Sequence, residues 1–182
     1  MDNLVNFILQ HEEINQTGLI LKGKEEKIQK DDIITTINFD NCNKVATAID
    51  DAIKNKIVER IKEIFSNDSR GYGYESPWVP GKIILPTVCE INLTDNTEIK
   101  EYAIGYPIPG GSYVDIYKKT GEGWKMVLTS SGIMIIQIEK GKTGDMHNIL
   151  IVNSLGAGNG TETRYKWNYF IEKYEKNQEW KY

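Results

Sequence analysis

The side chains best suited to catalysis in this 182-residue chain are two histidines and pairs of adjacent carboxylates such as Glu12/Glu13, Glu25/Glu26 and Asp50/Asp51. His11 and His147 are far apart in the sequence and match neither the H-x-x-x-H nor the H-x-E spacing of zinc enzymes. Carboxylates adjacent in sequence do not face each other on a helix or strand, whereas two-carboxylate catalysis needs groups that face across a cleft. We therefore predict no catalytic residue, no metal site and no cofactor.

Cys42 and Cys89 are the two cysteines, and their separation fits no metal-ligand spacing. One interpretation is a pair of buried reduced thiols. The other is a disulfide between the helical part and the first long strand, because an even number of cysteines suits an oxidising compartment. We predict the disulfide, or at least Cα atoms within ~4.4–6.8 Å of each other. Neither histidine comes with a cysteine-hydrolase signature, so we do not expect a nucleophilic cysteine.

Residues 71–81 are the segment that most suggests binding, because Tyr72, Tyr74 and Trp78 stand among glycines and prolines. Proline fixes its own φ and restricts the residue before it, so this loop should be stiff. A stiff loop presents aromatic rings at a lower ordering cost, and Tyr and Trp are enriched in binding hot spots. We predict these three as binding residues. The alternative is that they cap the core as ordinary packing aromatics.

The first third of the chain is predicted to be mainly helical. Residues 4–14 carry an apolar stripe at helical spacing. In residues 44–65 isoleucines recur every four residues, and Asn41 or Asn43 is the expected cap. Residues 18–39 indicate a hairpin with a charged loop.

Beyond Gly71, short β-prone runs alternate with glycine-containing turns, a pattern typical of an antiparallel meander. Gly156–Gly160 is predicted to be one of these turns and not a phosphate loop, because a strand follows it where a phosphate loop needs a helix. We expect one α+β domain over residues 1–182, with N-terminal helices (residues 1–70) packed on a C-terminal antiparallel β-meander (residues 82–175). The predicted strands are Lys82–Leu93, Glu98–Gly105, Tyr113–Lys119, Trp124–Thr129, Ile133–Glu139, Asn148–Asn153 and Thr163–Tyr174.

Residues 113–174 contain strand, glycine-turn and Trp/Tyr units, which alternate with a Gly144-Asp145 pair followed by the apolar run Ile149–Val152. In this pattern the last third of the chain resembles the strand repeats of bacterial extracytoplasmic proteins related to the integrin-type FG-GAP propeller. The resemblance implies a secreted, periplasmic or lipid-anchored protein. Blades of that family carry a calcium loop of alternating carboxylates, whereas residues 142–147 contain a single carboxylate. Calcium takes about six to eight oxygen ligands, so we expect none to bind here.

Charge and hydropathy argue against nucleic acid and against a membrane span. Lys and Arg form no basic stripe, and no apolar run approaches the ~20 residues of a transmembrane helix. The net charge of −4 arises in residues 1–75, which contain 14 Asp and Glu against 10 Lys and Arg. The first residues do not match a signal peptide. We expect a periplasmic or extracellular protein whose signal peptide is not part of this sequence, with a cytoplasmic protein as the alternative.

These observations favour a non-enzymatic binding protein, such as an inhibitor or immunity protein against a secreted enzyme or toxin. Its acidic first part would suit a basic partner protein, for example a basic secreted enzyme. The second hypothesis is a carbohydrate or cell-wall binding module that stacks sugars on Tyr72, Tyr74 and Trp78. The third is a small hydrolase built from dispersed residues, because a spatial triad need not show in a sequence.

Overall fold

The computed structural model describes residues 30–39, 42–44, 49–66, 86–108, 111–132, 134–156 and 159–182. The chain divides into two units, Met1–Lys30 and Asp31–Tyr182, and the strands and the α-helix given below belong to the second. A single 3-10 turn, η1 (Lys30–Asp32), leads into its first strand. Within the described residues, no helix is long and apolar enough to cross a membrane.

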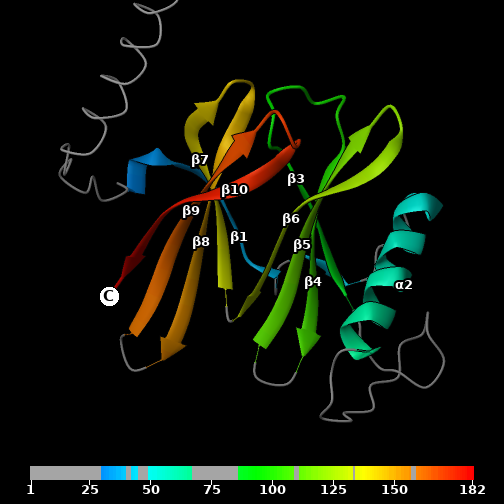
Figure 1. Ribbon diagram of the computed structural model, residues 1–182, viewed down its shortest axis with the longest axis horizontal. Helices are drawn as coiled ribbons and strands as arrows, with labels where there is room; N and C mark the ends of the chain where they lie inside the picture. The colour runs from blue at the N-terminus through cyan, green and yellow to red at the C-terminus, as the bar shows by residue number, and fades with distance from the viewer. Residues whose placement is uncertain are drawn as a thin grey trace, which may run out of the picture. The chain divides into compact units, whose positions relative to one another are not determined.

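Ten strands of the described part form two five-stranded antiparallel sheets (Figure 1). The first sheet has the order β2-β3-β4-β5-β6 and the second the order β1-β7-β8-β9-β10. The chain passes between them after β6, so the predicted meander is divided into two. The bounds are β1 (Ile33–Ile37), β2 (Asn43–Lys44), β3 (Thr87–Ile91), β4 (Glu101–Ile108), β5 (Gly111–Thr120), β6 (Gly123–Gly132), β7 (Met134–Thr143), β8 (Met146–Gly156), β9 (Asn159–Asn168) and β10 (Lys173–Lys181).

Side chains alternate along the strands of the first sheet and give it two apolar faces. Ile104 and Tyr106 of β4 belong to a cluster with the isoleucines of α2 (Asp51–Ser66). Ala103 of the same strand belongs to a cluster shared with the second sheet. The helix therefore covers one face of the first sheet and the second sheet covers the other, as Figure 1 shows.

The predicted combination of an antiparallel sheet region and a packed helix is present. The helix predicted at residues 44–65 begins only at Asp51, because Asp50 caps it: its Oδ1 accepts the Ala52 N–H at 2.8 Å. Asn43, one of the two predicted caps, lies in β2 instead.

Two elements predicted near the N-terminus fall wholly or partly outside the described residues. The helix at residues 4–14 is one, and the first half of the hairpin at residues 18–39 is the other. The second half of that hairpin forms β1, which pairs with β7, Ile37 lying opposite Ile136.

The prediction of a single strand at Thr163–Tyr174 is wrong. The chain turns at residues 169–172 and returns as β10, which places Tyr174 opposite Trp167 of β9. Most residues of this stretch are β-prone, and neither Gly nor Pro marks the turn. Glu172 adopts the positive φ, 49°, that glycine usually supplies.

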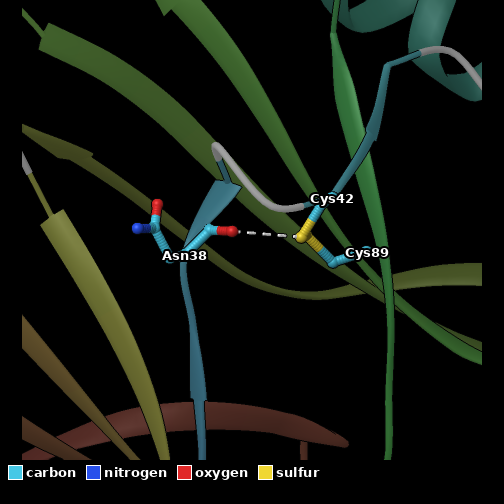
Figure 2. The surroundings of a disulfide bond; sticks show 3 residues. All are labelled: Asn38, Cys42 and Cys89. Atoms are coloured by element: carbon cyan, nitrogen blue, oxygen red, sulfur yellow. Dashed lines mark hydrogen bonds between the residues drawn. A yellow bond between two sulfur atoms is a disulfide. The ribbon is translucent and has the colours of Figure 1, made fainter.

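Cys42 and Cys89 form the predicted disulfide, with Cα atoms 5.3 Å apart (Figure 2). Cys89 lies on β3, and Cys42 directly precedes β2 in the segment that leads from the second sheet to the first. The carbonyl oxygen of Asn38 lies 3.4 Å from Cys42 Sγ. The bond thus fixes the passage from β1 to β2, where the chain first crosses from the second sheet to the first.

Candidate functional site

The binding residues predicted from the sequence, Tyr72, Tyr74 and Trp78, lie outside the described residues, and so does His11. Their roles stay predictions.

His147 is placed, and it is buried on β8. Its ring Nδ1 lies 2.8 Å from the carbonyl oxygen of Glu139, and its ring Nε2 lies 3.0 Å from Oδ1 of Asp95. The backbone N–H of His147 donates to the Leu93 carbonyl at 2.7 Å. These contacts fasten the β3–β4 loop to the second sheet, which is a structural role. Among the described residues, no group of three or more His, Cys, Asp or Glu is placed to hold a metal ion.

The turn between β9 and β10 exposes three consecutive apolar side chains. Phe170 is 99% exposed, Tyr169 52% and Ile171 48%. Apolar surface is unfavourable in water, and clustered exposure of this kind marks interaction sites. We name residues 169–172 the hairpin tip; it lies at the turn between the orange and red strands of Figure 1.

Asn168, the last residue of β9, fixes the conformation of the hairpin tip. Its Oδ1 accepts the N–H of Phe170 at 2.8 Å, which is the contact of an Asx turn. Its Nδ2 donates to the Glu175 carboxylate at 2.7 Å and so ties β9 to β10. The hairpin tip is a defined turn, closed by the positive φ of Glu172.

Tyr169 fastens one side of the hairpin tip to the β7–β8 turn. Its hydroxyl oxygen accepts the Asp145 N–H at 3.0 Å, and the hydroxyl can donate to Oδ1 of Asp145 (2.9 Å) or to the Thr143 carbonyl (3.0 Å). Gly144 makes room for this contact, since a Cβ there would lie 1.5 Å from the Tyr169 hydroxyl oxygen.

Lys125 fastens the other side of the hairpin tip to β6 of the first sheet. Its ammonium donates to the Glu172 carboxylate at 2.5 Å and to the Ile171 carbonyl at 3.4 Å. The same ammonium holds the pKa of Glu172 below its ordinary value. The hairpin tip is thus held from both sheets while Phe170 projects into solvent.

Trp167 packs against Tyr169 of the hairpin tip and is only 8% exposed. Its ring meets those of Tyr169 and Tyr174 edge to face, with centroids 6.4 and 5.2 Å away. A groove of about 330 Å³ runs beside this stack, with Lys166 and Phe170 among its lining residues. The site therefore combines a convex apolar projection with a shallow groove at its base.

A second groove, of about 440 Å³, lies between α2 and the first sheet. Arg60 in its wall donates to the fully buried carboxylate of Asp115 at 2.8 Å, and the Thr129 hydroxyl donates to the same carboxylate at 2.6 Å. Burial raises the pKa of Asp115, and the contacts with Thr129 and Arg60 oppose that shift. This network fastens the helix to the sheet.

A comparison with protein-family models found no match, and comparisons with curated proteins and with solved structures found none either. The resemblance to FG-GAP repeats is neither supported nor opposed by these comparisons and stays a prediction.

The hairpin tip was missed by sequence reasoning because its residues were assigned to a strand. Two signals were present. Asn168 is a typical turn residue, and three successive large apolar residues, Tyr169 to Ile171, break the alternation of a half-buried strand.

Proposed function

We propose that this protein is a non-enzymatic, extracytoplasmic binding protein that engages another protein through the hairpin tip. The observation that supports this most directly is the exposure of Phe170, between Tyr169 and Ile171, on a turn held from both sheets. An inhibitor or immunity protein is the concrete form, because a convex apolar projection suits a concave site on a secreted enzyme or toxin.

The energetics favour the hairpin tip as a binding hot spot. Burying a fully exposed Phe side chain stabilises a complex by roughly 1.5–3 kcal/mol. Immobilising each flexible interface side chain would cost about 0.5–1.5 kcal/mol, but Tyr169 is already held by Asp145. Prearranged aromatic side chains of this kind dominate many protein interfaces.

The Cys42–Cys89 disulfide supports the extracytoplasmic part of the proposal, because such bonds persist mainly in oxidising compartments. The periplasm and the cell exterior both meet this condition. The carbohydrate-binding alternative depends on Tyr72, Tyr74 and Trp78, which lie outside the described residues.

Site-specific photo-crosslinking tests the proposal. The photoreactive residue p-benzoylphenylalanine in place of Phe170 should capture one protein in the cells that produce the chain. The same residue in place of Glu122, exposed in the β5–β6 turn, is the matched control and should not capture it. Phe170→Ala should then weaken binding of the captured protein by more than ~2 kcal/mol.

The folded state should not change in that variant, because Phe170 is almost fully exposed. Thermal melting of Phe170→Ala should match the wild type within the ~0.5 kcal/mol typical of surface substitutions. Capture of no protein from position 170, or equal capture from position 122, would show that the hairpin tip is not the binding surface.

A further inference from the structure

A buried carboxylate lies between the two sheets. Glu101, the first residue of β4, is completely buried. Its Oε2 accepts the N–H of Leu93, whereas its Oε1 has no hydrogen-bond partner among the described residues. Burying an unpaired charged oxygen is unfavourable, so this group gains from a nearby cation or from a proton.

Lys118 provides a positive charge near this carboxylate. It lies directly opposite Glu101 on β5, and its Nζ is 5.4 Å from the ring centroid of Trp167 and 3.0 Å from Sδ of Met146. After the larger effect of Lys125, its charge also lowers the pKa of Glu172 in the hairpin tip. The Lys118 ammonium therefore acts on a buried carboxylate and on the hairpin tip at once.

We propose that protonation of Glu101 loosens the hairpin tip, through Lys118 and Trp167, so that the hairpin tip binds its partner more tightly at neutral than at acidic pH. The Lys118 ammonium lies over the face of Trp167, a favourable cation–π position, and the negative charge of Glu101 on the neighbouring strand attracts it. Once Glu101 is neutral, the half-buried Lys118 can turn to solvent. Trp167, whose ring contacts that of Tyr169, then loses its cation–π contact with Lys118.

The effect on binding rests on the proposed function, but the coupling between Glu101 and the hairpin tip does not. Burial raises the pKa of Glu101, and the hydrogen bond from the Leu93 N–H and the charge of Lys118 oppose that shift. Burial and then the charge of Glu101 raise the pKa of Tyr174 on β10, and the Asp95 carboxylate lies 3.0 Å from the His147 ring. Because the His147 ring lies against Asp95 of the β3–β4 loop, which also contacts this carboxylate, the test must separate an effect of Glu101 from one of His147.

Hydrogen exchange of two backbone amides reports on the hairpin tip directly. The Phe170 N–H donates to Asn168, and the Asp145 N–H donates to the Tyr169 hydroxyl. Measured by NMR from pH 4 to 8 and corrected for chemical exchange, their protection should fall roughly tenfold at the acidic end, as expected when one charge-dependent contact is lost.

Three variants identify the source of the change. Glu101→Gln should show the low protection at every pH, and Lys118→Met should remove the pH dependence. Glu90→Gln, exposed on β3, is the matched control and should behave as the wild type.

Two outcomes would overturn the coupling. One is pH-dependent protection that persists in Glu101→Gln, which would place the titrating group elsewhere, for example at His147. The other is a parallel loss of protection at Ile149 and Ile151 in the core, which would show global unfolding. Neither outcome depends on the crosslinking result, so this proposal and the proposed function can fail separately.

Discussion

At the scale of single residues, the hairpin tip depends on a glycine far from it in the sequence. Gly144 has a φ of +64°, and a Cβ there would collide with the Tyr169 hydroxyl oxygen. Gly144→Ala should therefore displace Tyr169 and lower stability by about 1–2 kcal/mol, measured by thermal or urea unfolding.

Gly121, in the β5–β6 turn, is the matched control for that substitution. A Cβ there would meet no atom within 4 Å. Gly121→Ala should leave the unfolding midpoint nearly unchanged, and equal losses in the two variants would contradict the role given to Gly144.

Glu101 also has a predictable effect on global stability. Because burial raises its pKa in the folded state, its contribution to stability is full at pH values below the unfolded-chain pKa of about 4.3. That contribution is lost as the pH rises through the folded-state pKa. The free energy of unfolding of the wild type, minus that of Glu101→Gln, should thus fall between pH 4 and 8.

If this difference in the free energy of unfolding rose with pH instead, the expected effect of Glu101 would be contradicted. Protonation of Glu101 should therefore raise the free energy of unfolding but lower amide protection at the hairpin tip. The two effects differ because a proton favours burial of Glu101 while releasing Lys118. Urea unfolding and amide exchange at the hairpin tip therefore test two distinct consequences of one titration.

At the scale of elements, α2 depends on the isoleucine stripe that the sequence shows. Ile53, Ile57 and Ile61 are completely buried against the first sheet. Ile57→Ala should cost about 2–5 kcal/mol in urea unfolding, as large-to-small changes in a core do. Lys62→Ala, on the exposed side of the helix, should cost less than ~0.5 kcal/mol. A small loss for Ile57→Ala would contradict the packing of α2 on the sheet.

The same helix shows what the sequence can and cannot predict. Its apolar period follows from local geometry, so its existence was predictable, as were most of the strands between glycine turns. Its start was not, because Asn43 and Lys44 pair with β3, a contact remote in sequence. The turn after Asn168 has local signals in the sequence, but part of what holds it is also remote in sequence. It is held by Asp145 and Lys125, which lie on other hairpins.

At the scale of the whole described unit, side-chain alternation alone could not show that the meander divides into two sheets. Both faces of the first sheet are apolar, one toward α2 and one toward the second sheet, so its strands are buried on both sides. The candidate site depends on that arrangement. The hairpin tip belongs to the second sheet but is held by Lys125 of the first.

The disulfide fixes the crossing from β1 to β2, and its removal is the prediction that tests this arrangement. Cys42 and Cys89 are 47 residues apart, and closing a loop of that size removes entropy from the unfolded chain worth about 4 kcal/mol in the chain-entropy treatment. The double variant Cys42→Ala/Cys89→Ala should therefore unfold at a clearly lower urea concentration than the oxidised wild type. The reduced wild type should shift in the same direction, and a reductant should leave the double variant unaffected. Equal unfolding midpoints for the oxidised and reduced wild type would show that the bond does not stabilise the crossing.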